Sequence, residues 1–354
     1  MRKDSKTSDT VVPLRTMPEH LDAMSRPLHD LRISVMDRCN FRCPYCMPED
    51  KYHPKFRFLD RDQRLTFTEI GRLTRLFVQL GAHKLRITGG EPLLRTGVAD
   101  LIADLSQLDG VSDVAMTTNA VLLAQHAAKL AASGLSRVTV SLDALDEETF
   151  SRTTGGRGGV ARVLDGIDAA VEAGLTPIKV NAVVERGVND HAVLSMVEHF
   201  RGTGIIVRFI EYMDVGNINH WRRRDMVPSA ELLQMIAARW PLTPVDANYH
   251  GEVANRYHFD DGNGEIGFIS SVTEPFCGSC TRARLSSDGQ MYTCLFASEG
   301  LDLRTPLRGG VSDQELLELI TAVWQKRKDR YSELRAKMPS DADPHKVEMY
   351  YIGG

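Results

Sequence analysis

LRISVMDRCNFRCPYC, residues 31–46, begins as a β-strand and ends in three closely spaced cysteines. Its first part alternates apolar side chains with Arg32 and Ser34, the two-residue period of a strand with one apolar and one polar face. The cysteines follow in the polar segment at the end of the strand. This stretch therefore predicts a strand whose tip carries a cluster of thiols.

The same unit, a strand followed by a polar tip and a helical pattern, recurs along the chain. Strand patterns cover residues 31–36, 84–88, 113–118, 137–142, 177–184 and 205–213. Helical patterns between them cover residues 66–80, 121–132, 160–173 and 190–200. This alternation predicts a parallel sheet with right-handed crossovers. Because eight units close a full barrel, six predict an α/β fold with a partial (β/α)6 TIM-like barrel.

The alternation stops near residue 245, which divides the chain into three predicted parts. Residues 1–28 are polar and lack a sustained period, so we expect a mobile N-terminal arm. The partial barrel then spans residues 29–245, and residues 246–354 form a C-terminal α+β extension with the second group of cysteines. Two helices and a final extended segment are expected in this extension, over residues 312–327, 329–338 and 345–351.

One face of the predicted strands carries polar side chains. Helices cover the outer face of such a sheet, so the polar face points inward, where a closed barrel is filled with branched apolar side chains. The interior must instead hold water or a polar ligand. Cations lie on four of the six strands: Arg32, Lys84, Arg86, Lys179 and Arg208. Cations that converge in this way predict a polyanion, and a phosphate chain is the simplest candidate.

The strand tips are polar too, which places a candidate active site at the carboxyl ends of the strands. The tips read Gly89-Gly90-Glu91-Pro92, Thr117-Thr118-Asn119, Ser141-Leu142-Asp143 and Glu211-Tyr212-Met213-Asp214. Gly89 and Gly90 would let a ligand approach the backbone closely. A Gly-Gly pair alone indicates only a tight bend, but its place among the other polar tips favours a site.

The composition is that of an ordinary globular protein, with 42% hydrophobic and 25% charged residues among 354. Lys and Arg number 43 against 47 Asp and Glu, a formal charge of −4, which argues against broad electrostatic binding of nucleic acid or an anionic membrane. No apolar run approaches the ~20 residues that span a bilayer, and the first residues carry no apolar signal region. We therefore expect a cytoplasmic protein.

The six cysteines fall into two triads with the spacings C-x3-C-x2-C and C-x2-C-x13-C. They are Cys39, Cys43 and Cys46 in the first triad, and Cys277, Cys280 and Cys294 in the second. Disulfide frameworks suit small secreted domains, so tight local clusters in a large chain favour metal. A structural zinc site and an ordinary four-iron cluster each take four ligands, so each triad is one ligand short.

Two kinds of metal site remain open at this point. For the first triad, the spacing favours an iron–sulfur cluster with one open iron over a zinc ion completed by His53. For the second triad, a zinc ion completed by His250 or His258 is an equal alternative.

Residues 38–46, RCNFRCPYC, resemble the cluster loop of radical S-adenosylmethionine enzymes, and the Gly-Gly-Glu-Pro tip of the next strand strengthens the resemblance. The second triad, the segment RFIEYMD that begins at Arg208, and the final Gly353-Gly354 narrow it to the GTP 3′,8-cyclase family of molybdenum cofactor biosynthesis. The resemblance covers the whole chain after the arm. One departure is Ala120, which stands where the family usually has Gly after Thr-Thr-Asn.

This resemblance implies two [4Fe–4S] clusters, the first chelating S-adenosylmethionine at its free iron and the second binding the guanine base of GTP. Tyr45, Gly90, Ser141 and Met213 match positions that contact S-adenosylmethionine. The GTP-binding positions are matched by Arg32, Arg86, Thr117, Lys179, Arg282, Ala283 and Arg284, with Lys84 and Arg208 as further phosphate-binding candidates. The family's Gly-Gly tail reaches into the active site.

The activity that the resemblance implies is a lyase reaction, the radical cyclisation of GTP to (8S)-3′,8-cyclo-7,8-dihydroguanosine 5′-triphosphate. No side chain is assigned as catalytic, because the radical chemistry belongs to the cofactor. The implied partners are GTP, an electron donor and the next enzyme of the pathway, cyclic pyranopterin monophosphate synthase. A homodimer is one candidate assembly.

Two other functions compete with this one. A different radical enzyme with an auxiliary cluster, acting on peptides, is disfavoured by the basic interior, because a peptide needs no such array of cations. A regulator that binds metal or nucleotide without turnover has no use for an open three-thiolate site.

Overall fold

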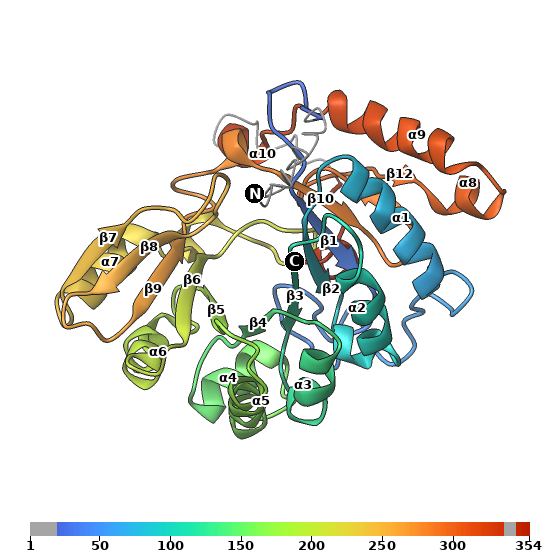
Figure 1. Ribbon diagram of the computed structural model, residues 1–354. Coiled ribbons are helices and arrows are strands. Elements are labelled where there is room, and N and C mark those ends of the chain that lie inside the picture. The colour runs from blue at the N-terminus through green and yellow to red at the C-terminus, as the bar shows by residue number, and fades with distance from the viewer. Residues whose placement is uncertain (1–19, 336–344) are drawn as a thin grey trace, which may run out of the picture.

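The six predicted strands are confirmed in a computed structural model, which describes residues 20–335 and 345–354. They are β1 (Asp30–Ser34), β2 (Lys84–Thr88), β3 (Asp113–Thr118), β4 (Arg137–Ser141), β5 (Lys179–Val184) and β6 (Ile206–Glu211). Each is parallel to the next, in the order of the sequence. The sheet curves into an open arc that does not close (Figure 1), which confirms the partial barrel.

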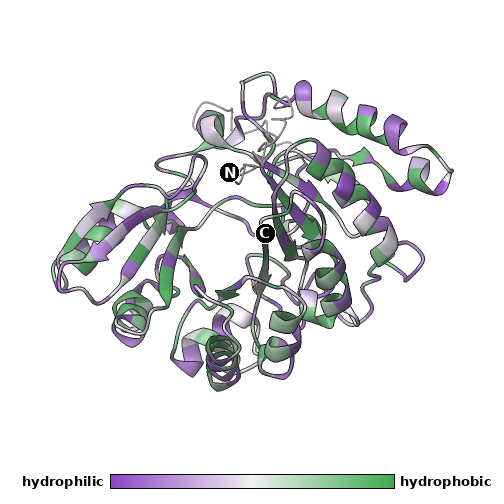
Figure 2. Ribbon diagram, in the orientation of Figure 1, coloured by the Kyte–Doolittle hydropathy of each residue, from purple (hydrophilic) through white to green (hydrophobic). Residues whose placement is uncertain are grey.

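Helices cover the outer face of this arc (Figure 1). They are α1 (Phe67–Gln79), α2 (Val98–Ser106), α3 (Leu123–Ala132), α4 (Glu147–Thr154), α5 (Val160–Glu172) and α6 (Val193–Phe200). Their hydrophobic and hydrophilic residues lie on different faces (Figure 2). In α1, for example, a capping box of Thr66 and Glu69 starts the helix, and Ile70, Leu73 and Phe77 are buried.

The strands place their apolar side chains against these helices and their polar ones inside the arc. Leu31, Ile33, Leu85 and Ile87 are at most 1% exposed and belong to the main hydrophobic core. Their neighbours in the sequence point the other way, because side chains alternate along a strand. The core thus lies between sheet and helices, and the concave side is left for polar groups.

The C-terminal extension lengthens the same sheet at both ends. Beyond β6 come β9 (Glu265–Ile269), β8 (Asn255–Phe259) and β7 (Leu242–Val245), with β9 parallel to β6. Beyond β1 come β10 (Arg282–Leu285), β11 (Gln290–Tyr292) and β12 (Leu301–Asp302), with β10 parallel to β1. The predicted domain boundary at residue 245 therefore falls between strands of one sheet, and it stays a prediction.

The remaining α-helices follow β6 in the chain, whereas the 3-10 helices lie in connections of both the barrel and the extension. The α-helices are α7 (Ser229–Ala237), α8 (Arg304–Arg308), α9 (Asp313–Gln325), α10 (Tyr331–Leu334) and α11 (Met349–Ile352), and the 3-10 helices are η1 (Pro92–Leu94), η2 (Asp190–Ala192), η3 (Arg223–Asp225) and η4 (Cys277–Ser279). The extended segment predicted over 345–351 is wrong from Met349 onward, where the chain forms the helical turn α11. In this turn Tyr350 packs on Tyr52, with ring centroids 5.0 Å apart. No helix among the described residues has both the length and the hydropathy needed to cross a membrane.

Of the predicted mobile arm, residues 1–19 lie outside the described residues. Residues 20–28 contact the C-terminal extension: the backbone N–H of Ala23 donates to the carbonyl of Arg327, and Trp324 Nε1 donates to the carbonyl of His20. The side chains of Asp22 and Arg26 are buried. This part of the segment is packed into the folded body.

Gly89 and Gly90 make room for the chain itself. A Cβ at Gly90 would lie 2.3 Å from the carbonyl oxygen of Arg38, and one at Gly89 would lie 2.5 Å from that of Met36. The backbone N–H of Gly90 donates to Met36, and that of Glu91 donates to Arg38. The two glycines therefore let the tip of β2 pack directly against the loop that carries the first triad.

We predict that Gly90→Ala lowers the free energy of unfolding by at least about 2 kcal/mol, because the added methyl group meets backbone that cannot move aside. The matched control is Gly71→Ala in the middle of α1, where the nearest atom is 4.0 Å away. Alanine favours a helix more than glycine does, so Gly71→Ala should raise the free energy of unfolding by about 1 kcal/mol. Urea unfolding of both variants measures the difference, and equal stability of the two would contradict it.

Candidate active site

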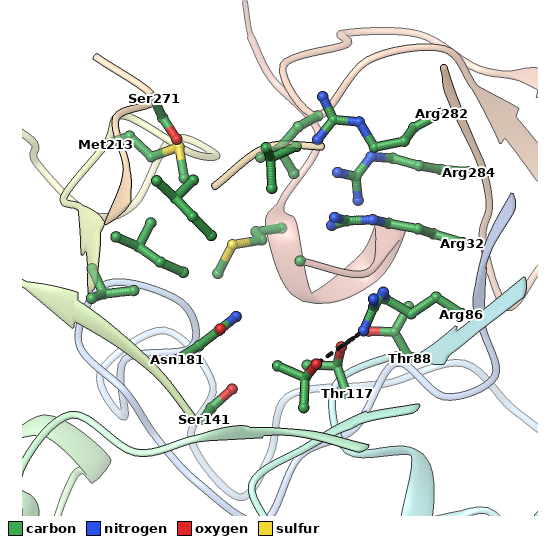
Figure 3. A pocket seen from close by; sticks show the side chains of 18 of the residues that line it. Arg32, Arg86, Thr88, Thr117, Ser141, Asn181, Met213, Ser271, Arg282 and Arg284 are labelled. Atoms are coloured by element: carbon green, nitrogen blue, oxygen red, sulfur yellow. Dashed lines mark hydrogen bonds between the residues drawn. The ribbon is translucent and has the colours of Figure 1, made fainter. Parts of the chain in front are cut away.

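Both cysteine triads line one cavity on the concave side of the sheet, although 230 residues separate them in the sequence. The cavity measures about 340 Å³, within the range of small-molecule sites. Strand tips surround it, as predicted, and Figure 3 shows arginines on one wall facing Met213, Ser271 and Asn181 on the other. The C-terminal end of the chain lies inside the arc (Figure 1).

Three arginines form a row across neighbouring strands. Arg32 in β1 is in register with Arg284 in β10 on one side and with Arg86 in β2 on the other. Parallel strands lie about 4.8 Å apart, so these side chains project into the cavity side by side, as Figure 3 shows. We call Arg284, Arg32 and Arg86 the arginine row.

Burial and mutual repulsion lower the pKa of Arg32 well below its ordinary value, with Arg284 and Arg282 the strongest repelling neighbours. The same causes lower the pKa of Arg284 to about 10. No residue that the structure describes forms a hydrogen bond or ion pair with the Arg32 guanidinium. A cation so placed attracts a polyanion, because an anion would relieve both the repulsion and the desolvation.

Further polar groups continue this wall around the arc. Arg86 Nη1 donates to Thr117 Oγ1 at 3.3 Å and to Thr139 Oγ1 at 3.2 Å. Arg208 Nε donates to Asn181 Oδ1 at 2.9 Å, and burial with repulsion from Arg86 lowers the pKa of Arg208 to about 9. These bonds hold the guanidinium groups in fixed directions.

The first triad lies in the loop between β1 and α1. Cys39 Sγ accepts a hydrogen bond from the N–H of Phe41 at 3.4 Å, and Asn119 Nδ2 lies 3.7 Å from the same sulfur. Burial raises the pKa of Cys39 to about 12, and it raises the pKa of Cys43 and Cys46 as well. Thiolates at these positions need a cation to balance them, so a metal cluster fits the donor set.

The second triad has a different electrostatic environment. Burial opposes ionisation of Cys280, but the charges of Arg282 and Arg327 outweigh it and lower the pKa of this thiol to about 6. Burial raises the pKa of Cys294 to about 11. Cys294 Sγ accepts from the N–H of Phe296 at 3.4 Å.

The zinc alternatives find no support in the geometry. Among the described residues, no three His, Cys, Asp or Glu side chains are placed to hold a single metal ion. The histidines considered as zinc ligands, His53, His250 and His258, are not among the residues that line the cavity. In an iron–sulfur cluster each thiolate binds a different iron, so the thiols need not converge on one ion.

The residues predicted for S-adenosylmethionine, Tyr45, Gly90, Ser141 and Met213, all line the cavity. Tyr45 Oη donates to Asp143 Oδ2 at 3.1 Å, which fixes the ring over the first triad loop. Of the predicted GTP set, Arg32, Arg86, Thr117, Arg282 and Arg284 line it too.

Lys179 and Ala283 do not line the cavity. Lys179 is the first residue of β5, and burial with the charge of Arg208 lowers its pKa to about 8. The Ala283 side chain is fully buried on the opposite face of β10, in the hydrophobic core. Ala283 can therefore offer a ligand only its backbone.

The Gly-Gly tail enters the cavity. Arg284 Nη1 donates to the carbonyl oxygens of Ile352, at 3.3 Å, and Gly353. Gly354 lies on the cavity wall. These carbonyl oxygens are neutral, so they bind Arg284 without cancelling its positive charge.

Two buried carboxylates that the sequence analysis did not assign hold the strand tips together. Glu91 accepts from Thr118 Oγ1 and from the N–H groups of Leu93 and Asn119, and burial raises its pKa to about 7. Glu211 accepts from the N–H groups of Ser229, Val272 and Thr273 and from the Thr273 hydroxyl. Glu91 and Glu211 lie in the polar segments at the ends of β2 and β6, which are visible in the sequence. Their burial reveals their role, and burial is a property of the tertiary structure.

Other wall residues differ in how visible they are in the sequence. Asn181 shares the polar face of its strand with Lys179, so the two-residue period marks it. Ser271 and Phe276, which also line the cavity, lie in irregular segments where no period exists.

Ala120 has a left-handed backbone, with φ of 62°, and is buried against α5. A Cβ added to Gly166 of that helix would lie 2.5 Å from the Ala120 carbonyl oxygen. Because it is not glycine, Ala120 in this left-handed conformation costs about 1–2 kcal/mol of backbone strain at the tip of β3, and the fold tolerates this cost.

Comparisons with known proteins agree with this geometry. Family models match at residues 33–200, for the radical SAM superfamily, and at residues 205–333, for the C-terminal region of molybdenum cofactor synthesis proteins. The GTP 3′,8-cyclase of Xanthomonas axonopodis pv. citri is 53% identical, over 94% of this chain and 98% of that protein. Those of Acidothermus cellulolyticus and Staphylococcus aureus are 50% and 45% identical, again over 94% of this chain and 98% of each relative.

Solved structures share the fold. SuiB of Streptococcus suis, bound to S-adenosylmethionine, is similar over 91% of this chain and 76% of its own, with a TM-score of 0.59 and 15% identity. The enzyme anSMEcpe, bound to S-adenosylmethionine and a peptide, is similar over 92% and 94%, with a TM-score of 0.54 and 14% identity.

We predict that Arg32→Met raises the free energy of unfolding of the ligand-free protein by about 1–2 kcal/mol, because it removes a repelling and unpaired cation from the arginine row. The control is Arg26→Met, which breaks a buried ion pair with Asp22 at 2.6 Å. This variant should lower the free energy of unfolding by about 3–5 kcal/mol. Denaturant unfolding checks both. Added tripolyphosphate should stabilise the unmodified chain more than Arg32→Met; an equal effect on the two would remove Arg32 from the anion site.

Proposed function

Because this chain belongs to the GTP 3′,8-cyclase family of radical S-adenosylmethionine enzymes, we propose a role for each wall of its cavity. The enzyme is a lyase that cyclises GTP in molybdenum cofactor biosynthesis. The proposal concerns which residues bind the two cofactor clusters, S-adenosylmethionine and the substrate.

The first triad would hold a [4Fe–4S] cluster, and S-adenosylmethionine would lie beside it against Tyr45, Gly90, Ser141 and Met213. When bound there, this cluster and S-adenosylmethionine would supply the radical chemistry of the reaction. The chain's own contribution is to orient and shield. The Glu91 carboxylate fixes the tips of β2 and β3, and the Tyr45 hydroxyl bond to Asp143 fixes the loop around the cofactor.

The second triad would hold a second [4Fe–4S] cluster, which binds the guanine base. The support is that Cys277, Cys280 and Cys294 line the same cavity as the first triad and leave one ligand position open. Arg282 and Arg284 follow this triad directly on β10. A base held at the triad would therefore have its phosphates within reach of these cations.

The arginine row would bind the triphosphate, with Thr117 and Lys179 adding a hydroxyl and a further charge. Three guanidinium groups in register match the spaced charges of a phosphate chain. An anchor at the base and another at the phosphates together fix the ribose between them, where the reaction occurs. The single observation that carries the proposal is that both triads line one cavity together with the arginine row.

A peptide substrate fits this cavity less well. Similar folds include SuiB, whose structure with a precursor peptide is known, but that likeness concerns the fold alone. The wall of this cavity carries six arginines, Arg32, Arg86, Arg208, Arg282, Arg284 and Arg327, and a peptide has no matching row of negative charges. An electron donor and the enzyme that consumes the product are proposed partners, and the cytoplasm is the proposed location.

The assay uses protein purified anaerobically and reconstituted with iron and sulfide. We expect about eight irons per chain, and 5′-deoxyadenosine formed only when GTP is added with S-adenosylmethionine and reductant. The triple variant Cys277→Ala, Cys280→Ala, Cys294→Ala should retain about four irons and lose the dependence on GTP. Bound zinc without cleavage of S-adenosylmethionine would overturn the proposal, and cleavage that is triggered by peptides but not by GTP would favour the alternative enzyme.

GTP binding should weaken as the pH rises above about 8, where ligand-free Lys179 loses its proton. A bound triphosphate favours charged Lys179 and so raises its pKa. By linkage, the affinity for GTP is greatest below pH 8 and falls by up to about tenfold for each pH unit above that value. Lys179→Arg keeps its charge and should flatten this dependence. Equilibrium dialysis of GTP at several pH values, without reductant, measures both proteins; identical profiles would show that Lys179 does not bind the substrate.

A further inference from the structure

Arg327 is buried beside the second triad, two residues after the end of α9. Its Nη2 donates to Cys280 Sγ at 3.0 Å, its Nη1 to the Cys280 carbonyl at 2.7 Å, and its Nε to the Thr293 carbonyl at 3.1 Å. Thr293 precedes Cys294. One guanidinium group therefore connects the two segments that supply the three cysteines.

The segment at residues 20–28 holds this guanidinium in place. Asp22 Oδ2 accepts from Arg327 Nη1 at 3.2 Å and from Arg26 Nε at 2.6 Å, and its side chain is fully buried. Arg26 Nη1 in turn donates to the carbonyls of Cys277 and Asp329, at 2.7 and 2.9 Å. We call Asp22, Arg26 and Arg327 the buried clamp.

Arg327 lines the cavity, and each of its three nitrogens already donates to a group of the protein. The guanidinium carbon of Arg327 lies over the ring of Trp324, 4.7 Å from its centroid. Asp329 lies 3.4 Å from Arg327 Nε but is one-third exposed, so solvent screens its charge. Arg26 and Arg327 share the single buried carboxylate of Asp22, so the clamp keeps a net positive charge beside the Cys280 sulfur.

We propose that Arg327 is a positioning residue of the second cluster, held by Asp22 and Arg26, and that its charged hydrogen bond to Cys280 makes that cluster easier to reduce. This inference rests on the proposed second cluster. Hydrogen bonds and positive charge at a ligand sulfur favour the reduced, more negative cluster. The clamp also places the sulfur, and with it the open ligand position that would face the base.

The test uses Arg327→Met and Arg327→Lys in a chain whose first triad is replaced by alanine, so that every signal comes from the second cluster. Iron content and the midpoint potential, followed by electron paramagnetic resonance, are the readouts. At a fixed potential, Arg327→Met should lower the ratio of reduced to oxidised cluster about tenfold, which is about 59 mV for a one-electron couple. Arg327→Lys keeps the charge and should remain close to the unmodified protein.

The matched control is Arg239→Met, where an exposed arginine pairs with Glu198 and neither residue lines the cavity. It should change neither readout. If Arg327→Met retains its iron and its midpoint potential is unshifted, this inference is overturned, whereas the proposed second cluster is not. If Arg327→Met loses its iron, Arg327→Lys decides: restored iron supports the role of the charge, and equal loss overturns it. Absence of iron from the second triad of the unmodified protein would instead end the proposed second cluster and this inference with it.

Discussion

The pairing of β10 with β1 is the constraint on which the rest of the site depends. It joins strands about 250 residues apart in the sequence and sets Arg284 beside Arg32. The same pairing brings the second triad, which precedes and follows β10, to the cavity that holds the first triad. Without it the two halves of the chain would each carry an incomplete site.

The cost of this pairing is electrostatic. Three arginines in register repel one another in a partly desolvated cavity, as the lowered pKa values of Arg32 and Arg284 show. The hydrophobic core between sheet and helices offsets this unfavourable term, because the apolar faces of the same strands are almost completely buried. The ligand-free enzyme thus holds in its fold the charge arrangement that its substrate needs, which is the physical meaning of preorganisation.

Buried carboxylates supply the precision of the site. Glu91 ties the tips of β2 and β3, Glu211 ties the tip of β6 to the extension, and Asp22 ties the N-terminal segment to the second triad. Each accepts several hydrogen bonds from segments that are distant in the sequence, which compensates the desolvation of its charge. The segments that carry the cysteines and the basic residues are therefore held in place by these carboxylates.

The sequence by itself determined the elements and the chemistry of this protein. The two-residue period identified six strands and the polar concave face, including Arg32 and Arg86, and the spacing of the cysteines predicted two metal sites. Period and spacing are local properties, so they survive without a structure. They did not place Ala283, whose side chain lies in the core, nor the helical turn at Tyr350, which depends on packing against Tyr52. Only the tertiary structure decided that β10 extends the sheet beside β1, that Arg284 joins the arginine row, and that Asp22 and Arg327 hold Cys280. These are pairings between residues far apart in the chain, and their register follows from the burial of one face of each strand, which no local pattern contains.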